Sequence, residues 1–260
     1  MLKFKCSLLP KNISKKIISC ALAAFTITSL AACGNTNSSA QAGAGNAGAG
    51  SSNTAQTVQQ TEFSANNSGS KILVAYFSYF DNTDSDKITS KRYADAMSSA
   101  SVTVVDGKRR GNNDVVADIL KEQTGADVFS ILTKEQYSPD YDGGVVEQAR
   151  IDGQKKVKPE LASHIANLDQ YDTVIILFPT WWYDMPMALY TFFDEYDFTG
   201  KTIAPIATSG GSGLVDTVNT IKQLEPGANV TEGLSIMQNA VSDSASDIAA
   251  WLNKTGIKTR

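Results

Sequence analysis

Two stretches of hydroxyl- and amide-bearing residues in this 260-residue chain could bind a phosphate group. The first is Ser78-Tyr-Phe-Asp-Asn-Thr83, and the second is Gly111-Asn-Asn-Asp114, which comes directly before a segment with helical periodicity. Free N–H groups at the start of a helix, together with hydroxyls and amides, form a common anion site. Helix capping and turn formation use the same residue types, so that alternative stays open. The candidate binding residues are Ser78, Tyr79, Asn82, Thr83, Gly111, Asn112 and Asn113.

Two further segments have residue types that suit a flat ligand. Phe178-Pro-Thr-Trp-Trp-Tyr-Asp184 places three large aromatic side chains in a row, and such rings can stack on a planar molecule. Thr208-Ser-Gly-Gly-Ser-Gly213 is rich in glycine, which lets backbone N–H and C=O groups approach a ligand edge. A packed loop or a partner-binding patch is the alternative for the first segment, and a flexible turn for the second. The candidate residues are Pro179, Thr180, Trp181, Trp182, Tyr183, Thr208, Ser209, Gly210 and Gly211.

Five apolar runs indicate the strands that position these segments. A short apolar run between polar residues is typical of a parallel strand covered on both faces. Pro205 lies inside the fourth run, and because proline has no N–H, we expect it at a strand start, a bulge or an unpaired position. Gly233 breaks the fifth run, which is the weakest. The predicted strands are 71–77, 127–132, 173–178, 202–208 and 230–236.

The intervals between these runs have the apolar spacing of helices. Asn112 is the expected N-cap of a helix that Gly125 ends after Thr124. Residues 142–168 are polar and predicted to be helical, with interruptions at Gly153 and Pro159. The other predicted helices are 187–196, with Pro186 in its first turn, 214–224 and 245–252.

The alternation of strands and helices predicts an α/β fold, a three-layer sandwich formed by one domain over residues 71–260. In a five-stranded parallel sheet of order 2-1-3-4-5, ligands bind beyond the carboxyl ends of the strands, where the strand order reverses. The loops after strands 1, 3 and 4 meet there. All candidate residues lie in those loops, so we expect them to form one site.

Residues 79–111 form an insertion after strand 1, where about two to six residues would be enough to reach the helix. Ser101-Val-Thr-Val-Val105 is followed by Asp106-Gly107, which predicts a hairpin with a tight turn. A long loop beside the carboxyl end of a strand could also close over the site as a lid.

The first 70 residues have a different composition from the rest of the chain. Residues 1–32 contain five Lys, no acidic residue and an apolar run from Ile17 to Ala32, which predicts a secretory leader. The run ends in Leu30-Ala-Ala-Cys-Gly34, which resembles the lipobox of bacterial lipoproteins and implies lipidation of Cys33; an ordinary secretory signal is the alternative. In residues 34–70, 34 of 37 positions are Gly, Ala, Ser, Asn, Thr or Gln, so residues 33–70 are predicted to be a lipidated cysteine and a disordered linker. We therefore expect a protein held by a lipid anchor on the extracytoplasmic face of the cell membrane.

The charges and cysteines exclude several kinds of protein. Without the five leader lysines, 18 basic residues face 27 acidic ones, a formal charge of −9, which argues against binding to nucleic acid. All three cysteines precede residue 34, so residues 71–260 hold no disulfide. His164 is expected on a surface helix rather than in catalysis. No catalytic acid, base, nucleophile or metal site is predicted.

Residues 71–260 resemble the flavodoxin family. The matching segments, in order, are Tyr76-Phe-Ser78, Gly111-Asn112, Pro179-Thr-Trp-Trp-Tyr183, Asp197-Phe-Thr-Gly-Lys201 and Thr208-Ser-Gly-Gly211. The resemblance departs from the family pattern at one point, because Asp81-Asn82-Thr83 lacks the usual Gly and the Gly-Asn pair returns about thirty residues later at 111–112. The phosphate contact is therefore expected from Ser78 and residues 111–113.

The resemblance implies FMN as the cofactor, with any redox chemistry residing in its ring. It further implies electron transfer to a redox partner protein, or the reduction of small acceptors such as quinones. Whether the protein is a carrier or an NAD(P)H-dependent reductase stays open. The alternative is a lipoprotein without redox activity that holds a planar or sugar ligand in the aromatic cleft.

Overall fold

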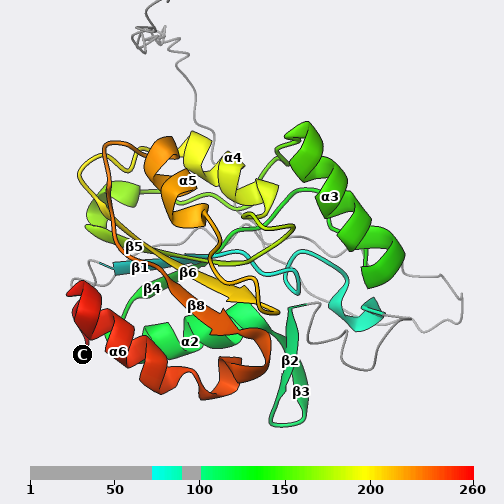
Figure 1. Cartoon of the computed structure of the whole chain (residues 1–260), viewed down its shortest axis with the longest axis horizontal. Helices are drawn as coiled ribbons and strands as arrows, with labels where there is room; N and C mark the ends of the chain where they lie inside the picture. The colour runs from blue at the N-terminus through cyan, green and yellow to red at the C-terminus, as the bar shows by residue number, and fades with distance from the viewer. Residues whose placement is uncertain (1–71, 90–100) are drawn as a thin grey trace, which may run out of the picture. The chain divides into compact units, whose positions relative to one another are not determined.

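The computed structural model describes residues 72–89 and 101–260 (Figure 1). The predicted leader over 1–32, the lipidation site Cys33 and the linker over 33–70 lie outside the described residues. Among the helices that the structure describes, none has the length and apolar character needed to cross a membrane.

A parallel sheet forms the centre of the domain. Its order is β4 (Asp127–Ser130), β1 (Ile72–Tyr76), β5 (Thr173–Pro179) and β6 (Thr202–Ser209), followed by β7 (Asn229–Val230) and β8 (Leu234–Met237), which both pair with β6. This confirms the predicted order 2-1-3-4-5, with the difference that the fifth strand is divided into two. The carboxyl ends of β1, β5 and β6 lie at one edge, as the predicted site requires.

The division of the fifth strand has a cause in β6. Ile203 pairs with Val230 and Ile206 pairs with Leu234, so Pro205 lies opposite the gap between β7 and β8. A Cβ atom at Gly233 would lie 3.1 Å from the Pro205 carbonyl oxygen, so a side chain there would be tightly packed against β6. Because Pro205 cannot donate a ladder hydrogen bond, it is unpaired on the side of β7 and β8, one of the positions that the sequence predicted, although it stays in register with Ile176 of β5.

Helices cover both faces of the sheet, and the strand residues alternate between the two layers (Figure 1). α2 (Asn112–Thr124) and α6 (Ala245–Thr255) pack on the face that includes Val74 and Ile175. α4 (Met187–Glu195) and α5 (Thr217–Leu224) pack on the opposite face with their neighbours. The three-layer α/β sandwich is therefore confirmed.

The ends of three helices differ from the prediction. The N-cap of α2 is Gly111 rather than Asn112, whose side chain is free to face the site. α5 begins at Thr217 rather than at 214, because Gly213 and Val215 have φ values of 66° and 49°, which a helix cannot include. α6 continues to Thr255, three residues beyond its predicted end at 252, and Gly256 ends it in the left-handed conformation.

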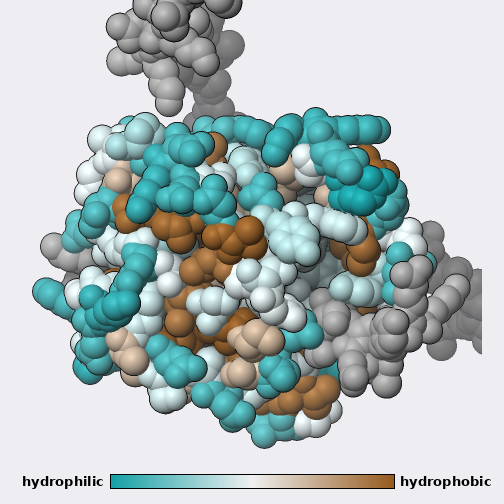
Figure 2. All heavy atoms as spheres, viewed as in Figure 1, coloured by the Kyte–Doolittle hydropathy of each residue, from teal (hydrophilic) through white to brown (hydrophobic). Residues whose placement is uncertain are grey.

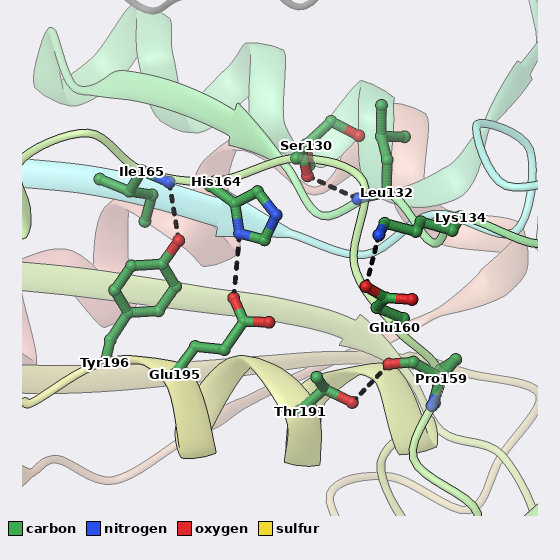
Figure 3. Close-up of polar contacts among 11 residues, drawn as sticks. Ser130, Leu132, Lys134, Pro159, Glu160, His164, Ile165, Thr191, Glu195 and Tyr196 are labelled. Atoms are coloured by element: carbon green, nitrogen blue, oxygen red, sulfur yellow. Dashed lines mark hydrogen bonds and ion pairs between the residues drawn. The ribbon is translucent and has the colours of Figure 1, made fainter.

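The helix predicted over 142–168 is wrong in its second half. The helical part is a π-helical turn at Tyr141–Val145 and α3 (Val146–Lys155), which passes through Gly153 and ends before Lys156, at φ 55°. Residues 156–167 lie between β4 and α4, and their backbone groups bond to side chains and to the backbone of Leu132 and Lys134 instead of forming helical bonds (Figure 3).

Figure 3 shows how both neighbours hold this segment. Ser163 Oγ donates to the carbonyl oxygen of Ser130 at 2.8 Å and accepts from Leu132 N at 2.8 Å. On the other side, Thr191 Oγ1 donates to the Pro159 carbonyl oxygen at 2.7 Å, and Tyr196 OH accepts from Ile165 N at 2.7 Å. At the surface, Lys134 forms an ion pair with Glu160, and His164 Nδ1 contacts Glu195 Oε2. A polar sequence pattern alone could not distinguish residues 156–167 from an exposed helix.

The described parts of the insertion contain the predicted hairpin. β2 (Val102–Val105) and β3 (Lys108–Gly111) pair antiparallel around Asp106 and Gly107, whose φ values of 51° and 74° are those of a type I′ turn. A short 3₁₀ turn, η1 (Ser85–Lys87), lies earlier in the insertion. Thr89 N donates to the carbonyl oxygen of Pro139, so this stretch runs along the segment that precedes α3.

Candidate functional site

A cavity of about 240 Å³ opens where the loops after β1, β5 and β6 meet. Nine of the sixteen predicted residues line it: Tyr79, Asn112, Pro179, Thr180, Trp181, Trp182, Thr208, Ser209 and Gly210. The sequence missed six others: Ser101, Tyr141, Val145, Val146, Ala149 and Gln238. All three predicted loops thus contribute to one site.

Near the start of α2, two side chains have buried atoms without a hydrogen-bond partner: Asn112, which lines the cavity, and Ser78, which does not. Ser78 and Asn112 are each 1% exposed, and Ser78 Oγ and Asn112 Oδ1 are buried and unpartnered. A Cβ atom at Gly111 would lie 2.3 Å from Ser78 Oγ, so the two segments can approach this closely only because residue 111 is glycine. Buried polar atoms without partners are rare and often indicate an absent ligand.

The other predicted polar residues bond to the protein itself. Asn82 Nδ2 donates to the carbonyl oxygens of Ser78 and Ile131, and its Oδ1 accepts from the backbone and hydroxyl of Thr133. Thr83 Oγ1 donates to the Tyr137 carbonyl oxygen at 2.7 Å.

Asn113 is used in the same way. Its Nδ2 donates to the carbonyl oxygen of Phe77 at 2.8 Å, and its Oδ1 accepts from the Thr208 hydroxyl at 2.8 Å. These contacts fasten the loop after β1 to its neighbours. Ligand binding by Asn82, Thr83 and Asn113 stays a prediction.

Two carboxyl groups lie beside the start of α2. Asp114 Oδ2 accepts from Gly111 N at 3.1 Å, and burial together with the nearby Asp81 carboxylate raises the pKa of Asp114 to about 6. Asp81 Oδ2 accepts from the Tyr76 hydroxyl at 2.9 Å and from Ser130 Oγ at 2.7 Å. Burial, with the charge of Asp81, raises the pKa of Tyr76 well above its usual value. The helix start thus already has an acidic neighbourhood.

The aromatic loop after β5 is a tight two-residue turn. Trp181 N donates to the Asp184 carbonyl oxygen at 2.8 Å, and Asp184 N donates to the Trp181 carbonyl oxygen at 2.9 Å. Trp182 and Tyr183 occupy the turn with φ values of 49° and 64°. Bulky residues with positive φ are strained, and such strain gathers at functional sites.

The three aromatic side chains of this loop have different environments. Trp181 makes edge-to-face contacts with Phe77 at 5.4 Å and Tyr137 at 5.3 Å between ring centroids, so it is a fixed wall of the cavity. Trp182 is 53% exposed, and its Nε1 donates to the Val146 carbonyl oxygen at 2.9 Å. Tyr183 is 71% exposed and does not line the cavity.

α3 supplies a wall of the cavity that the sequence did not predict. Val146 and Ala149 are three residues apart on this helix, and Tyr141 and Val145 come from the π-helical turn before it. π-helical turns often occur at functional sites. The sequence of this turn is polar and contains glycine, so it gives little indication of a helical turn. A second cavity of about 320 Å³ lies beside the first and shares Ala149, Trp181 and Trp182 with it.

The glycine-rich loop after β6 completes the site. Thr180 N donates to the Thr208 carbonyl oxygen at 2.9 Å, which joins this loop to the aromatic one. Ser209 Oγ accepts from Gly213 N at 2.9 Å, and Gly211, at φ 132°, does not line the cavity. A Cβ atom at Gly210 would lie 3.1 Å from the Gln238 side-chain oxygen, so the Gln238 amide lies against this glycine. No sequence pattern pointed to Gln238.

Over residues 72–89 and 101–260, no group of three or more His, Cys, Asp or Glu side chains could hold a metal ion. His164 lies in the segment 156–167 (Figure 3), where its Nδ1 contacts Glu195 Oε2 at 3.1 Å. It does not line the cavity. The cavity therefore offers hydroxyls, amides, backbone groups and aromatic rings.

Comparisons with known proteins identify the family of this chain. No curated protein matches the sequence significantly. A protein described as a flavoprotein from Bacteroides eggerthii is 26% identical, with a TM-score of 0.49, and the match covers 73% of this chain and 100% of that one. A flavoprotein from Lactobacillus acidophilus in complex with FMN is 17% identical, with a TM-score of 0.45 and coverage of 68% and 99%. The sequence model of the family described as flavodoxin matches residues 101–255, more than half of the chain, and the chain therefore belongs to the flavodoxin family.

Proposed function

We propose that this flavodoxin binds FMN in the cavity between the loops after β1, β5 and β6 and takes part in electron transfer. Family membership supports FMN as the cofactor. The observation that carries the proposal is the buried, unpartnered Asn112 Oδ1, which belongs to a residue that lines a cavity with aromatic walls. Flavin mononucleotide has the matching two ends, a polar ribityl phosphate and a flat ring.

Each part of the site would hold one part of the cofactor. Ser78, Ser101 and Asn112 would bind the ribityl phosphate end, near the start of α2. Trp181 and Trp182 would contact the ring and exclude water from it, and the Gly210 backbone with the Gln238 amide would bind its polar edge. When bound, FMN supplies one- and two-electron redox chemistry.

The electrons would go to a redox partner protein or to small acceptors such as quinones. Apolar surface gathers over α5 and β8 on the face seen in Figure 2, and Val215 and Met237 are 49% and 46% exposed. Together with the exposed Trp182 and Tyr183, these residues would provide contact surface for a partner. Steady-state assays with NAD(P)H and a quinone separate the two roles, because only a reductase turns over without a second protein.

We propose further that the protein is tethered to the extracytoplasmic face of the cell membrane through lipidated Cys33. The composition of residues 1–70 supports this location. The expected outcome is that the full chain fractionates with membranes and incorporates a labelled fatty acid, whereas Cys33→Ser does neither. A Cys33→Ser protein that still carries the label would overturn the lipidation proposal.

The spectrum of the full chain, purified in mild detergent, tests the cofactor. A yellow protein with the two visible absorption bands of a flavin, or a colourless one that gains them with FMN, is the expected result. A colourless protein that FMN does not reconstitute would contradict the proposal that the protein binds FMN. In that case a planar or sugar ligand in the aromatic cleft would be the next function to test.

A further inference from the structure

One arginine beside the cavity has no counter-ion among residues 72–89 and 101–260. Arg109 Nε and Nη2 are inaccessible to solvent and have no hydrogen-bond partner among the described residues. A guanidinium stays protonated in proteins, and a buried charge without a partner is strongly unfavourable. Arg109 is half-buried, and two of its three guanidinium nitrogens lack an acceptor that a bound anion would supply.

The hairpin places Arg109 close to the polar end of the cavity. Arg109 pairs with Val104 and Gly111 with Val102, so residues 109 and 111 share one face of the hairpin. Arg110, on the other face, forms an ion pair with Asp118 at 2.7 Å. Ser101 and Asn112, which flank the hairpin in the sequence, both line the cavity. The positive charge of Arg109 also opposes the rise in the pKa of Tyr79, another lining residue, to about 12.

The acidic residues around the start of α2 are a second reason to expect a positive charge near a bound phosphate. Asp81 and Asp114 lie near the helix start, and their carboxyl oxygens accept bonds from protein donors. Two carboxylates would repel a phosphate dianion bound at that place, so the helix N–H groups alone are a poor phosphate site. The charge of Arg110 already lowers the pKa of Asp114, and a second guanidinium would offset the remaining repulsion, with planar donors that match phosphate oxygens in geometry.

We propose that Arg109 is the counter-ion of the FMN phosphate and that it makes the site select FMN over riboflavin. This inference rests on the proposed flavin-binding function. It assigns a role to the insertion, because the hairpin brings in a charge that the loop after β1 does not contain.

The test compares FMN and riboflavin binding to the apo form of the full chain in detergent, by quenching of flavin fluorescence. We expect wild type to bind FMN at least about tenfold more tightly than riboflavin. Arg109→Gln should remove most of this ratio while riboflavin affinity changes by less than about twofold. Arg109→Lys, which keeps a point charge without the planar donors, should lie between the two.

Lys108→Gln is the matched control, because it removes one positive charge at an exposed position of the same hairpin, on the opposite face from Arg109. It should leave the ratio unchanged. In wild type, inorganic phosphate should compete with FMN but not with riboflavin. The inference is overturned if wild type binds both flavins equally, or if Arg109→Gln keeps the FMN preference. If wild type binds neither flavin, the proposed function fails and this inference fails with it.

Discussion

The loop that follows β1 and the loop that follows β5 both end at the cavity, but their side chains have opposite environments. In the first, Asn82 is 2% exposed and all of its polar atoms bond to the protein. In the second, Trp182 is 53% and Tyr183 71% exposed, and both have the strained positive φ. The first loop holds strands together. The second presents aromatic surface at an energetic cost.

This difference separates residues that maintain the site from residues that contact a ligand. Side chains that bond to backbone groups lower the free energy of the folded state, and their loss should reduce stability. Exposed residues in a strained turn add little to stability, so a ligand is the better reason for their presence. The predictions below test this separation with stability and flavin affinity as independent measurements.

The largest effect is expected from Asn82→Ala. The substitution leaves the buried carbonyl oxygens of Ser78 and Ile131, and the Thr133 donors, without their partner. We expect a loss of about 3–4 kcal/mol in the free energy of unfolding, measured by urea denaturation. Asn219→Ala is the control, because its side chain bonds only to Asp216 at the surface, and it should change stability by less than about 0.5 kcal/mol. Equal effects of the two substitutions would contradict a structural role for the loop.

The second effect concerns Asp114 and pH. Its pKa of about 6 in the folded protein lies above the usual 3.8, so the folded state binds more protons and its stability falls as pH rises from about 4 to 6. Asp114→Asn should abolish this fall and raise the free energy of unfolding at pH 7 by about 2–3 kcal/mol. Glu122→Gln, on the exposed side of the same helix, should keep the wild-type pH profile. A slope that persists in Asp114→Asn would assign the effect to another group.

The third effect distinguishes the two exposed aromatic residues. Trp182 lines the cavity and Tyr183 does not, although they are neighbours in one turn. We expect Trp182→Ala to weaken FMN binding by about 1–3 kcal/mol, and Tyr183→Ala to leave it within about 0.5 kcal/mol. Titration of the apo protein with FMN measures both. If both substitutions weaken binding equally, the aromatic turn acts as a unit and the distinction between its residues is wrong.

The sequence predicted the frame of the site better than its walls. The apolar runs of β1, β5 and β6 and the turn residues Asp106-Gly107 depend on local composition, and these predictions are confirmed. The break between β7 and β8 was visible in Gly233, which interrupts the fifth apolar run. The fold class then predicted that the loops after β1, β5 and β6 meet at one edge of the sheet.

The remaining parts depend on contacts between distant segments. The segment over 156–167 was predicted to be helical although it is polar and contains Pro159, and its bonds to Ser130, Leu132 and Thr191 explain why it is not. Gln238 and the α3 wall contact the cavity through tertiary packing that no spacing in the sequence encodes. Asn82 and Asn113 are residue types that often bind ligands in polar loops. The sequence does not show whether their amides face the ligand or the protein.

The smallest effect concerns the strain in the aromatic turn itself. Glycine adopts the φ of 64° found at Tyr183 without steric cost, so Tyr183→Gly should raise the free energy of unfolding by about 0.5–1 kcal/mol. Tyr183→Ala, which keeps the Cβ atom and removes the same ring, should not. Because a glycine also loosens the turn that orients Trp182, FMN affinity should fall about twofold to fivefold in Tyr183→Gly. Higher stability with weaker binding would mean that the strain serves the ligand. If both rise together, the positive φ is incidental to binding, and the contrast between the two loops reduces to exposure alone.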